Sequence, residues 1–235
     1  EFIKKTPLEL SLRLSEKYNC NIFLKREDLQ KTRSFKIRGS INKILKNRDS
    51  NAIIVCASAG NHAQGVAYCC NLLGLRGEIF CPITTPPQKI GRIKNFGGTN
   101  IDLKLVGGNF NESLEISKNY CLEKEGLFIH PYDDIDIIEG QGTIGKEILD
   151  ENYNVDILMG CLGGGGLMSG VSSYFKNISP ECLIYGVEPL GAESMTLAFE
   201  KGGAFKMEDI DNFVDGASVS RVGELTYSLC KENLD

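Results

Sequence analysis

Short apolar runs alternate along the chain with longer segments in which apolar residues recur every three or four positions. The short runs predict strands and the periodic segments predict helices. In the segment 61–73, for example, Ala63, Val66 and Cys70 fall on one helical stripe. The predicted strands are Ile53–Ala57, Glu78–Cys81, Ile101–Val106, Val155–Leu162 and Leu183–Val187. The predicted helices are Asn61–Leu73, Pro87–Phe96, Asn111–Glu123, Gly142–Leu149, Leu167–Phe175 and Glu193–Glu200.

This alternation predicts an α/β fold of two lobes. Continuous apolar strands that alternate with helices are typical of a parallel sheet covered on both faces. Residues 52–133 form a self-contained βαβαβα block, and we predict that they make a small lobe. The flanking residues 1–51 and 134–235 could pair into a second sheet, which predicts a large lobe. A cleft between two such lobes is the usual place for a small-molecule site.

Composition excludes several functional classes. The 235 residues are 42% apolar, carry a net charge of −5 and disperse their Lys and Arg, which argues against a nucleic-acid surface. No stretch is long and apolar enough to predict a membrane span. The nine cysteines show no C-x-x-C pair, and only His62 and His130 could join them, so we predict no metal site.

Unpaired cysteines are typical of small apolar side chains that are buried in a protein of a reducing compartment. We therefore predict that the protein is cytoplasmic or occupies another reducing compartment. The chain begins at Glu1 and not at a methionine, which is consistent with a trimmed leader.

Four consecutive glycines, Gly163 to Gly166, stand between a predicted strand and a predicted helix that starts at Leu167. Glycines allow unusual backbone angles and close approach to a ligand, and amides at a helix N-terminus bind anions. The segment therefore predicts a phosphate site. A flexible turn that binds nothing is one alternative. A dinucleotide site is another, since Glu188 ends the next strand, although Ser169 replaces the third glycine of that fingerprint.

Lys36 lies between an aromatic residue, Phe35, and a helix-like apolar run. A lone lysine is usually a solvated surface charge. A lysine that is partly removed from water has a lowered pKa, however, and can act as a Schiff-base nucleophile. The residues alone leave both interpretations open.

A third segment, Ala57–Gly65, follows a predicted strand and opens a predicted helix. Its small residues expose backbone amides at a positive helix end, where a substrate carboxylate could bind. Alternatively, Ser58 or Asn61 is a plain N-cap. We do not expect a serine–histidine triad, because Ser58 and His62 share one turn and the chain has no G-x-S-x-G elbow.

Together, in this order, the three segments resemble one enzyme family. Ser-Phe-Lys-x-Arg-Gly, Ser-Ala-Gly-Asn-His-Ala-Gln-Gly and Gly-Gly-Gly-Gly-Leu are similar to motifs of pyridoxal-phosphate enzymes of the tryptophan-synthase-β type (fold type II). The nearest resemblance is to the threonine dehydratases, with serine dehydratases and serine racemases as relatives. Supporting stretches occur along the whole chain: Lys5–Leu8, Lys25–Asp28, Phe96–Gly98, Glu139–Thr143 and Asp215–Gly216.

The resemblance implies a role for each motif residue, with pyridoxal 5′-phosphate as cofactor. Lys36 would bind the cofactor covalently and later move the α-proton of the substrate. Phe35 would pack on the cofactor ring, and Asn61 would hydrogen-bond its 3′-oxygen. The phosphate would be held by Gly163, Gly164, Gly165, Gly166 and Leu167. The carboxylate of the amino-acid substrate would be held by Ser58, Ala59, Gly60, Asn61 and His62.

The implied activity is deamination of L-threonine, and of L-serine, by α,β-elimination of water, as in isoleucine biosynthesis. The products would be 2-oxobutanoate or pyruvate and ammonia. Racemases of the family have a serine where this chain has Ala59, so we expect elimination without efficient racemisation. Their metal site is only partly matched, because Ser194 stands where a carboxylate is expected, so no metal is predicted.

The family's catalytic domain continues beyond the length of this sequence, so the resemblance implies that its C-terminal part, with the partner of the pyridine nitrogen, is absent here. Three alternatives therefore remain: a truncated or degenerate relative with weak or no catalysis, a serine racemase, or a β-replacement enzyme of the same fold. The resemblance also implies a homodimer or homotetramer, with no nucleic-acid or membrane partner.

Overall fold

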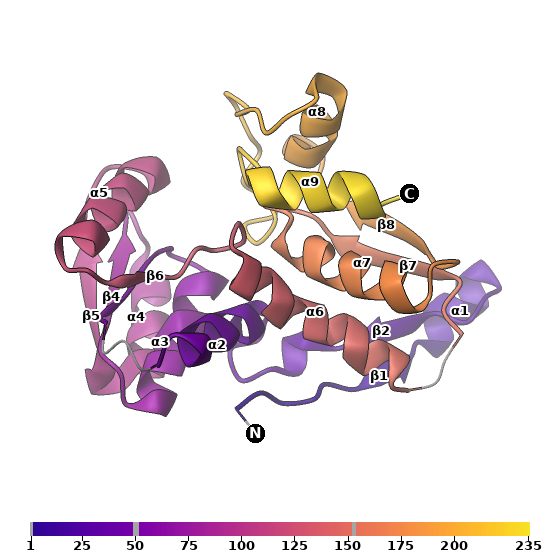
Figure 1. The fold of residues 1–235 in the computed structure, drawn as a ribbon, viewed down its shortest axis with the longest axis horizontal. Coiled ribbons are helices and arrows are strands. Elements are labelled where there is room, and N and C mark those ends of the chain that lie inside the picture. The colour runs from indigo at the N-terminus through magenta and orange to yellow at the C-terminus, as the bar shows by residue number, and fades with distance from the viewer. Residues whose placement is uncertain (1, 49–51, 152–153) are drawn as a thin grey trace.

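The computed structural model describes residues 2–48, 52–151 and 154–235 (Figure 1). The chain begins with β1 (Leu8–Leu10), α1 (Leu12–Tyr18), β2 (Phe23–Lys25), the short helix η1 (Glu27–Leu29) and α2 (Lys36–Lys46). Strands β1 and β2 pair antiparallel. The predicted boundary between the lobes, at residue 51, lies outside the described residues.

A parallel four-stranded sheet, in the order β5-β4-β3-β6, organises the middle of the chain. Its strands are β3 (Ile54–Ala57), β4 (Gly77–Cys81), β5 (Ile101–Leu105) and β6 (Leu127–Phe128), connected by α3 (Asn61–Leu73), α4 (Pro87–Gly97), η3 (Gly98–Asn100) and α5 (Phe110–Glu123). One face of the sheet packs on α2, α3 and α4, and the other face packs on α5. Both faces are covered, which confirms the predicted α/β fold.

The rest of the chain forms a second unit with α6 (Ile135–Leu149), β7 (Ile157–Cys161), α7 (Gly166–Ile178), β8 (Leu183–Val187), α8 (Ser194–Lys201) and α9 (Glu224–Asn233). Strands β7 and β8 are parallel, and their inner face packs on these helices. In the described residues β7–β8 and β1–β2 are separate two-stranded sheets, so the expected second sheet is not one continuous sheet.

The outer face of β7 and β8 is apolar and exposed: it carries Ile157, Met159, Leu183 and Val187. Cys161 lies on this face and is exposed, as is Cys20, whereas the other seven cysteines are buried and all nine are free. The prediction of burial was therefore wrong for Cys20, and it was also wrong for Cys161. Its apolar run resembled a strand covered on both sides, but in the described residues helices cover only the inner face.

Helix α6 lies between α2 and α7 (Figure 1) and begins seven residues before the predicted start at Gly142. Asp134 caps it by accepting hydrogen bonds from the amides of Asp136 and Ile137. Its glycines allow close contact between backbones. A Cβ on Gly140 would lie 2.6 Å from Cα of Gly39 on α2. The predicted start at Gly142 was therefore too late, because Gly140 is a contact point inside the helix.

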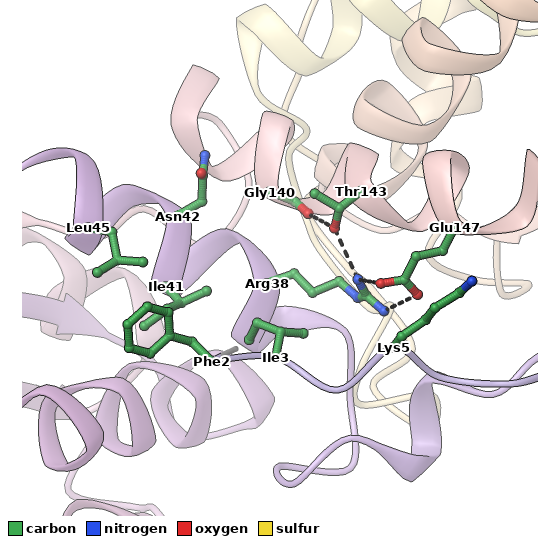
Figure 2. A pocket seen from close by; sticks show the side chains of 10 residues that line it. All are labelled: Phe2, Ile3, Lys5, Arg38, Ile41, Asn42, Leu45, Gly140, Thr143 and Glu147. Carbon is green, nitrogen blue, oxygen red and sulfur yellow. Dashed lines mark hydrogen bonds and ion pairs between the residues drawn. The ribbon is translucent and has the colours of Figure 1, made fainter. Parts of the chain in front are cut away.

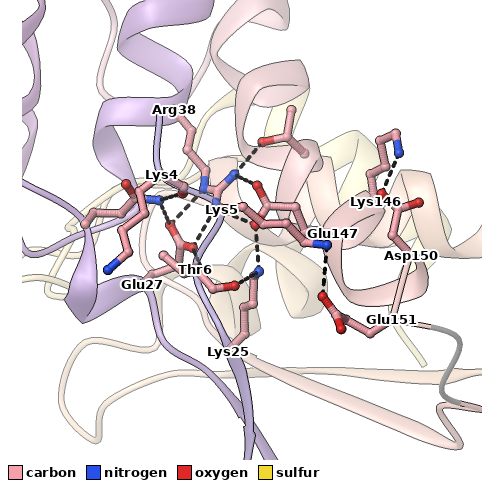
Figure 3. Close-up of polar contacts among 12 residues, drawn as sticks. Lys4, Lys5, Thr6, Lys25, Glu27, Arg38, Lys146, Glu147, Asp150 and Glu151 are labelled. Carbon is pink, nitrogen blue, oxygen red and sulfur yellow. Dashed lines mark hydrogen bonds and ion pairs between the residues drawn. The ribbon is translucent and has the colours of Figure 1, made fainter. Parts of the chain in front are cut away.

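Helix α2 is anchored by a buried ionic network around Arg38 (Figure 3). Its guanidinium donates two hydrogen bonds to Glu27, both 2.8 Å long, and two to Glu147, 2.7 and 2.8 Å long. Lys25 adds a third ion pair, 2.6 Å from Glu147. Burial opposes ionisation of Glu147, but hydrogen bonds from Arg38 and Lys25 hold its pKa below the usual value. The network joins β2, η1, α2 and α6 near the first turn of α2.

We expect Arg38→Met to lower the free energy of unfolding by about 3–5 kcal/mol, because it leaves two partly buried carboxylates without their main cation. Urea denaturation measures the change. Arg26 is a matched control, since it also pairs with two carboxylates, Glu9 and Asp28, but lies at the surface. Arg26→Met should cost much less. Equal losses in the two variants would contradict the prediction.

None of the helices in the described ranges combines the length and the apolar composition needed to cross a bilayer. Helix α2, predicted as part of the large lobe, packs Ile37, Ile41 and Ile44 into the core beside the four-stranded sheet. The division of the chain into two lobes stays a prediction.

Candidate functional site

Lys36 is the first residue of α2, and its side chain is partly buried. Its Nζ donates a hydrogen bond to the carbonyl oxygen of Pro131 over 2.7 Å and lies 5.4 Å from the centre of the Phe35 ring. Burial lowers the pKa of Lys36 from 10.5 to about 8. The side chain is therefore not a solvated surface charge, and near neutral pH its neutral fraction is much larger than that of a solvated lysine.

Both histidines lie close to Lys36 and are neutral. Nε2 of His62 donates to the carbonyl oxygen of Ile129 over 2.8 Å, and Nδ1 of His130 accepts from the amide of Asp133 over 2.7 Å. Burial, followed by the charge of Lys36, lowers the pKa of His62 to about 3, and burial lowers that of His130 to about 4. The His62 ring thus points into the core, so only its backbone can serve the predicted carboxylate site.

The four glycines follow β7 and lead into α7, and three of them, Gly164, Gly165 and Gly166, are buried. Gly165 is the N-cap of α7 and has φ +94°, a left-handed angle that favours glycine. Among the described residues, no acceptor receives a hydrogen bond from the amides of Gly163, Gly164 and Gly165. Unpaired amides at a helix N-terminus fit an anionic ligand such as a phosphate.

Neighbouring residues leave no space for side chains at two of these glycines. A Cβ on Gly164 would lie 2.3 Å from the ring of Tyr132, and one on Gly166 would lie 2.9 Å from its Cα. Leu167 and Phe35 are partly buried and pack against the same core, beside β7 and β8. Glu188 does not point to a ribose site, because its carboxylate accepts from the amides of Met195 and Thr196 and caps α8.

The third segment connects β3 to α3, with Gly60 as N-cap and no capping bond from a side chain. Ser58 Oγ accepts instead from the amide of Gly60, over 3.1 Å. The alternative that Ser58 or Asn61 is a plain N-cap was therefore wrong. A Cβ on Gly60 would meet nothing within 4 Å, so the start of α3 borders open space. Ala59 packs against the core beneath it.

A short segment, Asp215–Ala217, contacts both loops. A Cβ on Gly163 would lie 2.9 Å from the carbonyl oxygen of Ala217, and one on Gly216 would lie 3.9 Å from Nδ2 of Asn61. Asp215 pairs with Lys89 of α4 over 2.8 Å. The segment thus places the glycine loop near the start of α3, although the two are about a hundred residues apart in sequence.

Sequence reasoning missed the turn His130–Asp133, which follows β6. Pro131 holds Lys36, Tyr132 packs on the glycine loop, and Asp133 accepts from amides at the start of α9. A weak signal was available: the turn follows an apolar run, Leu127–Ile129, and the carboxyl ends of parallel strands are the usual position of a site. The corresponding turn after β3 carries Ser58 to His62.

A cavity of about 310 Å³ opens beside Asn61 and is lined by Thr32, Arg33, Asn61, Gln64, Arg92, Asn95 and Phe96. A larger cavity, of about 400 Å³, lies between the N-terminal segment, α2 and α6 (Figure 2) and contains none of the predicted site residues. Of the predicted site residues, only Asn61 lines the smaller cavity. The contacts of Pro131, Tyr132 and Ala217 therefore define the candidate site.

Several known proteins are similar to the chain in sequence or in structure. Biosynthetic L-threonine dehydratases of Staphylococcus epidermidis and Halalkalibacterium halodurans are 49% and 45% identical to the chain, over 99% and 100% of its length. The processed form of threonine deaminase isoform 2 from Solanum lycopersicum superposes with a TM-score of 0.93 at 41% identity, over 99% of this chain and 64% of that one. Maize serine racemase superposes with a TM-score of 0.91 at 29% identity, over 99% of this chain and 70% of that one.

The chain spans 57% of the length of each of the two bacterial relatives. A family model described as "Pyridoxal-phosphate dependent enzyme" matches residues 1–235. The unpaired loop amides fit the phosphate of that cofactor, and the partly buried lysine fits its aldehyde. The match over the whole sequence shows that the chain belongs to the family of pyridoxal-phosphate dependent enzymes.

Proposed function

We propose that the protein deaminates L-threonine, and also L-serine, by α,β-elimination of water. The observation that carries this proposal is the partly buried amine of Lys36, whose pKa is lowered to about 8, next to a turn that also packs on unpaired glycine amides. The names of the dehydratase and deaminase relatives support the choice of reaction.

Under this proposal, different residues would bind different parts of the cofactor. The amides of Gly163 to Gly166, with Leu167, would hold the phosphate, and Lys36 would hold the aldehyde carbon. Phe35 would pack on the ring, and Asn61 would hydrogen-bond the 3′-oxygen. When bound, pyridoxal phosphate supplies an electron sink that makes the α-proton of an amino acid removable.

The protein's own groups would bind and orient the substrate and move its proton. The segment from Ser58 to His62 would hold the carboxylate of the amino acid next to the positive helix end, through the hydroxyl of Ser58 and the amides of Ala59, Asn61 and His62. The amide of Ser58 itself donates to the carbonyl oxygen of Phe80. Neutral Lys36 would take the α-proton, because its lowered pKa leaves a free amine near neutral pH. The β-hydroxyl would leave as water, and water added later would release ammonia and the 2-oxo acid.

Ala59 supports elimination over racemisation. Racemisation needs a proton donor on the face of the substrate opposite to Lys36, and a methyl side chain cannot donate a proton. Its neighbour Ser58 orients Oγ toward the amide of Gly60. We therefore propose that little D-amino acid is formed, although a serine racemase is among the structural neighbours.

Assays with the purified protein and pyridoxal phosphate test the function. L-Threonine should yield 2-oxobutanoate and ammonia in equal amounts, and L-serine should yield pyruvate and ammonia. Product requiring an added thiol or sulfide would indicate β-replacement instead. Absence of any product in a single turnover, at stoichiometric protein, would overturn the proposal and favour a degenerate relative.

The reactivity of Lys36 toward pyridoxal phosphate should rise with pH to a plateau, with a midpoint near pH 8. Only the neutral amine attacks an aldehyde, and burial lowers the pKa of Lys36 from 10.5 to about 8. Raising the pH through 8 therefore increases the reactive fraction. Stopped-flow absorbance between pH 6 and 11 measures the rate. A midpoint near 10.5, the value of a solvated lysine, would contradict the assignment.

We also propose a homodimer or homotetramer in the cytoplasm or another reducing compartment. The free state of all nine cysteines supports the reducing compartment. Light scattering of the purified protein measures the oligomeric state. A monomer at micromolar concentration would contradict the proposed homodimer or homotetramer.

A further inference from the structure

Thr226 lies in the first turn of α9, which packs along α7 (Figure 1). Its side chain is 0% exposed. Its Oγ1 donates to the carbonyl oxygen of Gly164 over 2.7 Å and accepts from the amide of Gly223 over 3.0 Å. A Cβ on Gly165 would lie 2.7 Å from Thr226 Cβ, so the residue touches two consecutive members of the glycine loop.

Asp133 holds Thr226 in place. Its carboxylate accepts from the amides of Glu224, Leu225 and Thr226, over 3.2, 3.0 and 3.1 Å, and so occupies the positive end of α9. The same turn of chain supplies the carbonyl oxygen of Pro131 to Lys36. Through this turn, the start of α9 is connected to both the amine and the glycine loop.

The hydrogen bond from Thr226 has a directional consequence for the loop. The carbonyl of Gly164 and the amide of Gly165 belong to one planar, trans peptide, in which C=O and N–H point in opposite directions. Because the carbonyl points at Thr226, the amide of Gly165 points away from α9. That amide has no acceptor among the described residues.

We propose that Thr226, supported by Asp133, is a positioning residue for the phosphate of the cofactor: it fixes the peptide between Gly164 and Gly165 so that the loop amide faces the ligand. The inference rests on the proposed function, since it assumes that the loop binds the phosphate of pyridoxal phosphate. Helix α9, which no sequence pattern predicted, would thereby contribute to the site without touching the ligand.

The test compares two ligands that share an aldehyde and differ in the phosphate. Pyridoxal phosphate and pyridoxal are titrated into wild-type protein and into Thr226→Val, which keeps the shape of the side chain and removes its hydroxyl. We expect the variant to bind pyridoxal phosphate about 10- to 100-fold more weakly, as for a buried carbonyl that loses its partner. Pyridoxal affinity should change less than about twofold, because pyridoxal does not use the loop.

Two further variants separate positioning from general stability. Thr226→Ser keeps the hydroxyl and should restore most of the affinity for pyridoxal phosphate. Ser172→Ala removes another fully buried hydroxyl, on α7, and should leave both affinities unchanged. Asp133→Asn serves if Thr226→Val does not fold. This variant weakens the cap of α9 but keeps an acceptor oxygen. It should lower the ratio of pyridoxal phosphate affinity to pyridoxal affinity by about 3- to 10-fold.

The outcomes are distinguishable. Two results with folded Thr226→Val would overturn this inference and leave the proposed function standing. One is an equal loss of affinity for both ligands. The other is a pyridoxal phosphate affinity equal to that of the wild type. An unchanged ratio in Asp133→Asn would overturn it too. Wild-type protein that binds neither aldehyde would overturn the proposed function and this inference together.

Discussion

Replacing Lys36 by alanine should abolish the covalent attachment of pyridoxal phosphate and reduce deamination by at least about 10²–10⁴-fold, the contribution of one positioned proton-transfer group. The reason is geometric. Lys36 is held by a 2.7 Å hydrogen bond to Pro131 beside the glycine loop, and burial lowers its pKa to about 8. Borohydride reduction followed by peptide mapping should trap the cofactor on the wild-type peptide that contains Lys36, and not in the variant.

Lys46→Ala is the matched control. Lys46 is on the same helix but extends to solvent, where it pairs with Asp136 and Glu139. This variant should keep the trapped cofactor and its activity. If Lys36→Ala retained a reducible chromophore, or if the label mapped to another lysine, the assignment of the site would be wrong.

Gly165→Ala should weaken pyridoxal phosphate binding by about 100-fold or more and also destabilise the fold. Two costs combine. Its φ of +94° is strained for any residue with a Cβ, and the added Cβ would lie 2.7 Å from Cβ of Thr226 and 2.9 Å from Cε of Met195. The loop must move to relieve these contacts, so its amides no longer face one ligand. Fluorescence titration with the cofactor and urea denaturation measure the two effects.

Gly202→Ala separates strain from contact. Gly202 has φ +77°, but a Cβ there would meet nothing within 4 Å, and it ends α8 away from the loop. The Gly202→Ala variant should have a lower free energy of unfolding, because of backbone strain, and an unchanged affinity for the cofactor. Cofactor affinity in Gly165→Ala equal to that of the wild type would show that the loop does not bind the phosphate.

Much of the fold could be predicted from the residues alone, because apolar periodicity records which face of a segment is buried. Strands β3, β4, β5 and β8 and helix α3 were predicted within a residue or two. Strands β1, β2 and β6 have only two or three residues, too few to show a period. Helix α6 was predicted too short, because its glycines serve contacts with α2 and α7 that no local pattern reveals.

For the site, too, some features could be inferred from local sequence and others depend on tertiary contacts. Lys36, the glycine loop and the start of α3 are runs of consecutive residues, so their chemistry could be inferred from sequence, while their roles toward the cofactor stay proposals. Pro131, Asp133 and Thr226 act through a carbonyl oxygen, a helix cap and a single hydroxyl. The apolar run before Pro131 and Asp133 indicates only the position of a turn, and no neighbouring residue indicates these roles. They arise only when packing brings together segments that lie 60 to 95 residues apart, because a hydrogen bond depends on position in space and not on sequence distance.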